Sequence, residues 1–142
     1  MLIRVRLAPG TLCGMKAVEL CPCGLGERYP DCCGRLHRGE VAAPTAELLM
    51  RSRFSAFATG AEAYLLDTWH PSTRPQQLQL DRALRWTRLE ILATTGGGFL
   101  DPAGTVAFRA HFTDRGRPGR HEEDSRFVRE GGRWFYLDAA TG

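Results

Sequence analysis

Apolar side chains recur at helical spacing between residues 45 and 61. One helical face is formed by apolar residues at steps of four and three: Ala46, Met50, Phe54, Phe57 and Ala61. Thr45 is a typical N-cap residue at the start of this pattern, and Gly60 is a typical residue to end or bend a helix. A second helix is predicted over residues 61–69, because the residue before Pro71 is disfavoured in helical conformation.

Alternation of apolar and polar residues replaces helical spacing later in the chain. The clearest strand pattern is Val106, Phe108, Ala110 and Phe112. Further strands are predicted over residues 86–93, 119–130 and 133–139, with Gly131-Gly132 as a tight hairpin turn. Helices followed by a run of antiparallel strands predict an α+β domain. If the sheet curls around the helices, it forms a cone with a pocket in its mouth.

Composition and charge restrict the class of protein. With 142 residues, 43% of them apolar, the chain suits one globular domain with a very small appendage. A net charge of +3 is too small to indicate nucleic acid by itself, so no DNA partner is expected. No apolar run approaches the ~18 residues of a membrane span. The first twenty residues do not form a secretory signal, which favours the cytoplasm, where thiols stay reduced.

Four cysteines lie within thirteen positions, in the pattern Cys21-x-Cys23-x8-Cys32-Cys33. Four thiolates complete a tetrahedral Zn²⁺ site with Zn–S distances near ~2.3 Å. The glycines and the proline between the two pairs allow the chain to fold back on itself. Such a site leaves no position for water, so the sequence predicts structural zinc whose binding is coupled to local folding.

Other chemistry for these cysteines stays open. A Cys32–Cys33 disulfide would be strained, because adjacent Cα atoms are only ~3.8 Å apart, while crossed bridges such as Cys21–Cys32 are sterically possible. A reducing compartment argues against disulfides. An iron–sulfur cluster usually has other spacings. A reduced, metal-free cluster and a redox role are the remaining alternatives.

Charged residues surround the cluster in the sequence. Arg28, Arg35 and Arg38 are predicted to offset the −2 charge of a four-thiolate zinc site. They would also suit an acidic protein or an RNA phosphate. His37 follows the cluster and is interpreted as a solvated side chain rather than a ligand. Cys13 lies outside the pattern and is interpreted as a free thiol.

The segment CPCGLGERYPDCCG (21–34) resembles the SEC-C zinc motif found at the carboxyl end of SecA. Four further segments extend the likeness to the YchJ family of bacterial proteins of uncharacterised function: LLMRSRFSAF (48–57), AYLLDTWHPS (63–72), EDSRF (123–127) and GRWFYLDA (132–139). The resemblance implies a zinc knuckle joined to a nuclear-transport-factor-2-like, or cystatin-like, cone. The predicted organisation is an N-terminal extension (1–20), the zinc knuckle (21–40) and the cone domain (41–142).

A polar group is predicted inside the cone. Arg53 lies on the apolar face of the first helix, and a buried charge must be paired. Glu123 shares a strand face with Phe127, so an Arg53–Glu123 pair is predicted, with Asp67 and Asp124 as other partners. The candidate pocket residues are Arg53, Tyr64, Trp69, His70, Trp86, Glu123, Ser125, Trp134 and Tyr136. The large rings among them are also typical of a small core.

These features favour a binding module over an enzyme. The zinc knuckle would dock on a protein or the ribosome, and the cone would take a small ligand or a peptide. One alternative is a small-molecule enzyme of isomerase, dehydratase or hydrolase type, with Glu123 or His70 as base and Tyr64 or Tyr136 as proton donor. A thiol–zinc redox sensor is the other alternative. No catalytic residue is assigned.

Overall fold

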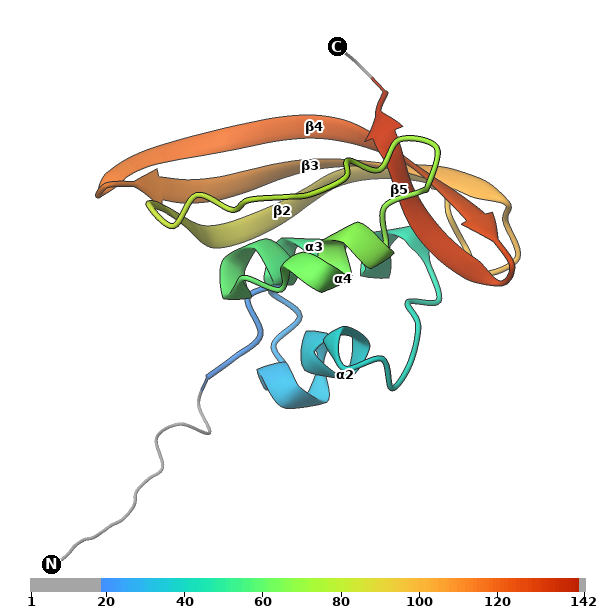
Figure 1. Ribbon diagram of the computed structural model, residues 1–142, viewed down its shortest axis with the longest axis horizontal. Helices are drawn as coiled ribbons and strands as arrows, with labels where there is room; N and C mark the ends of the chain where they lie inside the picture. Colours follow the sequence, from blue (N-terminus) through green and yellow to red (C-terminus); the bar gives the residue numbers. More distant parts are fainter. Residues whose placement is uncertain (1–18, 141–142) are drawn as a thin grey trace, which may run out of the picture.

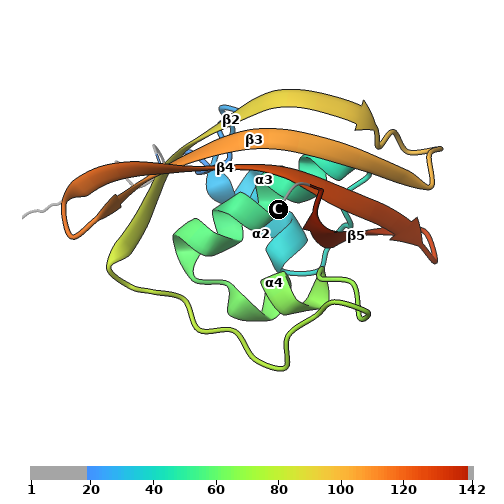
Figure 2. The ribbon, with the colours of Figure 1, turned by 90° about the horizontal axis from the view of Figure 1, so that it is seen from above.

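The computed structural model of the protein describes residues 19–140. A four-stranded sheet curves over two helices, α3 (Ala46–Thr59) and α4 (Glu62–Asp67) (Figures 1 and 2). The segment predicted as a zinc knuckle, called the knuckle below, contains the 3-10 turn η2 (Tyr29–Asp31) and helix α2 (Cys33–His37) and lies on the side of these helices away from the sheet (Figure 1). The predicted α+β class is confirmed. Most of the predicted N-terminal extension, including Cys13, lies outside the described residues.

The sheet is an antiparallel meander in the order β2-β3-β4-β5. Its strands are β2 (Leu84–Gly96), β3 (Ala103–Asp114), β4 (Arg117–Glu130) and β5 (Arg133–Ala139). Each strand predicted from alternation is present, and β2 and β4 are longer than predicted. Two register shifts between β2 and β3 and one between β4 and β5 interrupt the ladders. Such irregularities bend strands, which is consistent with the curvature of the sheet.

Both ends of α3 agree with the prediction. The side-chain oxygen of Thr45 accepts a hydrogen bond from the backbone N–H of Leu48 (3.1 Å). At the other end Gly60 adopts the left-handed conformation with φ 81°, which favours glycine. The core lies between α3 and the sheet. Its buried members are Leu49, Met50 and Phe54 of α3 with Leu89, Val106, Phe108, Ala110, Phe127 and Trp134 of the strands.

Helix α4 ends at Asp67, two residues before the predicted end. The chain then pairs with the edge of β5: the N–H of Tyr136 donates to the carbonyl of Thr68 (2.8 Å), and the N–H of His70 donates to the carbonyl of Tyr136 (2.8 Å). These bonds replace a further helical turn. Within residues 19–140, no helix is long and apolar enough to cross a bilayer.

The β2–β3 hairpin contains a close approach of two glycines. A methyl group added to Gly104 would lie 2.5 Å from both Cα and N of Gly97, which are backbone atoms. We expect Gly104→Ala to lower the free energy of unfolding by about 1–3 kcal/mol, because the hairpin must shift to relieve this overlap. Urea unfolding measures the change. The exposed neighbour provides a control, Ala103→Ser, and equal stability of the two variants would contradict the prediction.

Candidate metal centre and cone cavity

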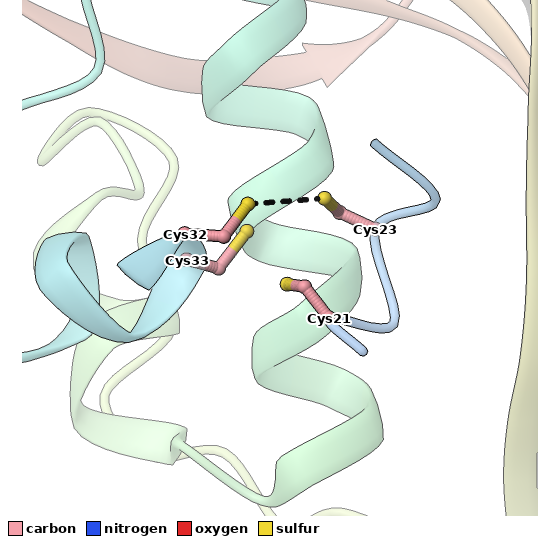
Figure 3. Close-up of side chains that lie close together, drawn as sticks. All are labelled: Cys21, Cys23, Cys32 and Cys33. Carbon is pink, nitrogen blue, oxygen red and sulfur yellow. Dashed lines mark hydrogen bonds between the residues drawn. The ribbon is translucent and has the colours of Figure 1, made fainter. Parts of the chain in front are cut away.

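The sulfur atoms of Cys21, Cys23, Cys32 and Cys33 converge (Figure 3). All four Sγ atoms lie within 4.8 Å of one another, and those of Cys23 and Cys32 are 3.6 Å apart. A tetrahedral ion with Zn–S bonds near 2.3 Å would place its four sulfurs about 3.8 Å apart. The four-thiol donor set and its spacing therefore fit a single tetrahedral metal ion.

A short loop turns the first cysteine pair toward the second. The backbone N–H of Cys21 donates to the carbonyl of Glu27 (2.7 Å), which closes the loop. Gly24 and Gly26 have φ values of 88° and 90°, in the region that favours glycine. Cys32 and Cys33 then lie at the start of α2. The glycines thus have the turning role that the sequence predicts.

The cluster is buried against α3. Three of its side chains are almost inaccessible: Cys21 is 4%, Cys23 0% and Cys33 2% exposed. The Oγ atom of Ser55 lies 3.3 Å from the Sγ atom of Cys21. Hydrogen bonds from Cys23 and Cys33 hold the pKa of the Cys21 thiol far below its usual range. The same hydrogen bonds raise the pKa values of the Cys23 and Cys33 thiols. The arrangement therefore favours one thiolate, at Cys21, and the thiolate is the form that binds metal.

The arginines near the cluster in sequence do not have the predicted contacts. Each lies within 4.0 Å of an exposed carboxylate: Arg28 pairs with Asp31, and Arg35 and Arg38 pair with Glu40. The arginine that reaches the cluster is Arg51 of α3, whose Nη1 donates to the carbonyl of Cys23 (2.7 Å). Sequence reasoning missed Arg51. The available signal was the polar face that Arg51, Ser52 and Ser55 form on the helix.

His37 is half-buried and both of its ring nitrogens have protein partners, so the interpretation as a solvated side chain was wrong. Its Nδ1 lies 2.6 Å from the hydroxyl of Tyr29, and its Nε2 lies 2.9 Å from the carbonyl of Ser52 in α3. The ring packs at 4.6 Å between centroids against Tyr64. Burial lowers the pKa of His37 and so favours a neutral ring. Such a ring accepts from Tyr29 at Nδ1 and donates to Ser52 from Nε2, which joins α2 to α3.

We expect His37→Phe to lower the free energy of unfolding by about 1–3 kcal/mol, because the variant loses both hydrogen bonds and strands the Tyr29 hydroxyl. Tyr29→Phe is the matched comparison, since it removes only one of the two bonds and should cost about 1 kcal/mol. Urea unfolding with excess zinc present measures both. A His37→Phe variant as stable as the wild type would show that this contact is not holding the knuckle.

A cavity of about 500 Å³ opens between α3 and the concave face of the sheet. Ligand pockets commonly have volumes of about 300–1,000 Å³ and apolar walls. The apolar lining consists mainly of Met50, Phe54 and Phe57 of α3 and Leu84, Trp86, Phe108, Ala110 and Phe112 of β2 and β3. Arg120 and His121 of β4 also contribute to the lining.

The structure brings six of the nine candidate pocket residues to this cavity: Arg53, Trp69, Trp86, Glu123, Ser125 and Tyr136. The other three lie elsewhere. The hydroxyl of Tyr64 lies 2.7 Å from that of Ser52, on the knuckle side of α3. His70 pairs with Glu130 (3.0 Å) at the end of β4. Trp134 is buried in the core, and its Nε1 donates to the carbonyl of Pro44 (3.2 Å).

The predicted Arg53–Glu123 ion pair is absent, and within residues 19–140 no carboxylate lies within 4.0 Å of Arg53. Its Nη1 donates instead to the carbonyl of Leu65 (2.8 Å) and the hydroxyl of Thr68 (2.7 Å). Its guanidinium carbon lies 4.7 Å from the ring centroid of Tyr136. The aromatic ring contacts the guanidinium in place of the predicted carboxylate.

Glu123 is held by three other side chains. Its Oε2 accepts from the hydroxyls of Ser125 (2.7 Å) and Tyr136 (2.9 Å), and its Oε1 lies 3.0 Å from Nε2 of His121. Burial alone would raise the pKa of Glu123, but hydrogen bonds from Ser125, His121 and Tyr136 outweigh it and lower the pKa. Glu123 is therefore a hydrogen-bonded carboxylate. Tyr136 connects Glu123 to Arg53, because its hydroxyl donates to Glu123 and its ring contacts the guanidinium of Arg53.

Two solved structures have a similar fold. The solution structure of a SEC-C motif containing protein from Rhodopseudomonas palustris has a TM-score of 0.74 and 32% identity, covering 86% of this chain and 98% of that one. The crystal structure of a SEC-C motif containing protein from Psychrobacter arcticus has a TM-score of 0.72 and 26% identity, covering 89% of this chain and 84% of that one.

Proteins with similar sequences identify the family. A UPF0225 protein of Streptomyces avermitilis is 57% identical over 118 residues, which are 83% of this chain and 81% of the relative. A UPF0225 protein of Corynebacterium glutamicum is 55% identical over 116 residues, covering 82% and 92%. Residues 45–139 match the family model described as "YchJ, middle NTF2-like domain". The chain therefore belongs to the UPF0225, or YchJ, family, with a SEC-C-like four-cysteine cluster beside its nuclear-transport-factor-2-like domain.

Proposed function

We propose that the protein is a zinc-organised binding module. One Zn²⁺ bound by the four thiolates holds the zinc knuckle against α3, and the cone cavity receives a small ligand. The observation that carries this proposal is the double role of α3. Its polar face contacts the knuckle through Arg51, Ser52 and Ser55, and its apolar face lines the cavity through Met50, Arg53, Phe54 and Phe57.

The zinc part of the proposal rests on the donor set. All four donors are sulfurs, three are almost fully buried, and their spacing suits tetrahedral coordination. Four protein ligands leave no position for a substrate or water, so the metal is structural. Burial also argues against the redox-sensor alternative, because sensor cysteines are solvent-accessible.

The test of the zinc site is metal content under reducing conditions. We expect about one zinc per chain in the wild type and almost none in Cys23→Ser, since structural zinc sites need all four ligands. Ser55→Ala is the control, because it removes a contact to Cys21 but no ligand. Metal-free wild-type protein, or full zinc occupancy in Cys23→Ser, would overturn this part.

The hydrogen bonds of Glu123 favour a ligand-binding role of the cavity over a catalytic one. A general base works best with a pKa near the operating pH, which for glutamate means a raised value. Hydrogen bonds lower the pKa of Glu123 instead. His70 and Tyr64 lie outside the cavity, which removes two of the other groups considered for an enzyme.

The test of the cavity uses small naphthalene probes and the variant Ala110→Phe, which places a ring in the cavity from a buried wall position. We expect a probe such as 2-naphthamide to shift the NMR signal of the Trp86 indole, and Ala110→Phe to abolish this shift. Absence of binding by every naphthyl probe would overturn the cavity role. Docking of the knuckle on a protein or the ribosome stays a prediction, as does the cytoplasmic location.

A further inference from the structure

Two side chains in the cavity lining, Arg53 and Trp69, have hydrogen-bond donors without an acceptor among the described residues. All hydrogen bonds of Arg53 within that part of the chain leave from Nη1, so Nε and Nη2 have no partner there. The indole Nε1 of Trp69 is buried and also has no acceptor within residues 19–140. The guanidinium carbon of Arg53 lies 5.2 Å from the Trp69 ring centroid, so the two groups are neighbours. A buried donor without a partner, such as the Trp69 indole, is uncommon in proteins and indicates a missing acceptor.

Arg53 is a buried cation that has no carboxylate partner in the part of the chain that the structure describes. Only 3% of the residue is exposed to solvent. Burial lowers the pKa of Arg53 to about 10, which leaves the group charged at neutral pH. The rings of Trp69 and Tyr136 compensate part of this charge through cation–π contacts. The unused edge, Nε with Nη2, is a pair of parallel donors that matches the two oxygens of a carboxylate.

The carboxylate of Glu123 does not fill this role. Both of its oxygens are engaged, by Ser125, Tyr136 and His121, and it lies beyond 4.0 Å from Arg53. The charged groups lining the cavity are Arg53 and Arg120, both positive, and Glu123, negative. Arg120 pairs with Glu122 (3.8 Å), so among these groups only the charge of Arg53 has no partner of opposite charge within residues 19–140, which suits a ligand with one negative charge.

We propose that the cone cavity binds small amphipathic monocarboxylates, aromatic or aliphatic. The carboxylate lies against Arg53 and Trp69, and the apolar body packs among Phe54, Phe57, Trp86, Phe108 and Phe112. Aromatic side chains outnumber polar ones in the lining of the cavity, which favours a ligand with one compact charged end and an apolar body. This inference rests on the proposed function, because it specifies the ligand class of the same cavity.

A charge series of probes tests the inference: 2-naphthoate, the neutral 2-naphthamide and the cationic 2-naphthylmethylamine have the same ring system. Isothermal titration of the zinc-loaded full chain gives their dissociation constants, and NMR shifts of the Trp69 and Trp86 indoles locate the probes. We expect naphthoate to bind at least about tenfold more tightly than naphthamide, as for a hydrogen-bonded ion pair. The Trp69 indole proton should shift only with naphthoate.

Two variants keep the test decisive. Arg53→Gln should reduce the preference for naphthoate over naphthamide to less than about threefold. If that variant does not fold, Trp69→Phe still removes one donor while keeping an aromatic ring, and it should weaken naphthoate binding severalfold without changing naphthamide binding. Equal binding of the acid and the amide, or tightest binding of the amine, would overturn this inference while leaving the cavity role intact. Absence of binding by all three probes would overturn both.

Discussion

Cys33→Ser is expected to abolish metal binding and to release the zinc knuckle from α3. Structural zinc contributes about 10–16 kcal/mol of apparent binding free energy in small zinc-binding peptides. The hydrogen bonds that His37 and Arg51 donate between the knuckle and the helix contribute about 1–3 kcal/mol each. These bonds are too weak to keep a short segment of loops and one helical turn folded. The metal is therefore expected to dominate the stability of this lobe.

Hydrogen–deuterium exchange measures the release region by region. In Cys33→Ser, amides of α2 should exchange at rates close to those of unfolded chain, and protection of α3 should fall on the side that carries Ser52 and Ser55. Strands β3 and β4 should keep their protection. Their buried residues Val106, Phe108 and Phe127 belong to the core that the sheet forms with α3. A chelator added to the reduced wild type should reproduce the pattern.

Ser55→Ala is the matched control for this experiment. It removes the hydroxyl 3.3 Å from the Cys21 sulfur but leaves all four proposed ligands in place. We expect it to retain zinc and the protection of α2. If Cys33→Ser kept wild-type protection in α2, the knuckle would be held by its contacts with α3 alone, and the metal would not have the structural role proposed for it.

Local signals made the secondary structure predictable. Thr45 and Gly60 mark the ends of α3 through their own side-chain and backbone preferences, which need no tertiary context. The alternation of Val106, Phe108 and Ala110 predicts which face of β3 is buried, and all three are buried. The cysteine spacing likewise predicted convergence, because the two pairs are joined by a loop short enough to fold back.

The contacts between elements were not predictable in the same way. A helical wheel places Arg53 on the apolar face, but the register of β4 and β5 decides that Tyr136, rather than Glu123, contacts its guanidinium. The early end of α4 depends on pairing between Thr68 and Tyr136, which are distant in the sequence. The position of His37 between the knuckle and α3 depends on docking of the two parts. Each of these features is tertiary, and periodicity carries no information about it.

Phe127→Ala is expected to lower the free energy of unfolding by about 3–5 kcal/mol, the usual cost of truncating a buried phenylalanine. Phe127 is fully buried in β4, and its ring lies 5.8 Å from that of Tyr136. Phe127 pairs with Gly104 of β3 on one side and with Tyr136 of β5 on the other. Because β4 is held on both sides, the backbone is not free to move into the space that the missing ring would leave. Domains of this size are stabilised by only about 5–15 kcal/mol. The variant should therefore be close to unfolding at physiological temperature.

Phe99→Ala is the matched control, because it removes the same side chain from the tip of the β2–β3 hairpin, where Phe99 is 64% exposed. We expect this change to cost less than about 0.5 kcal/mol, as for surface substitutions in general. Thermal and urea unfolding of both variants, each loaded with zinc, separate the core from the metal site. The zinc content of Phe127→Ala should equal that of the wild type while the protein is folded, because the cysteines pack on the opposite face of α3. Equal losses of stability in the two variants would contradict the position of the core between α3 and the sheet.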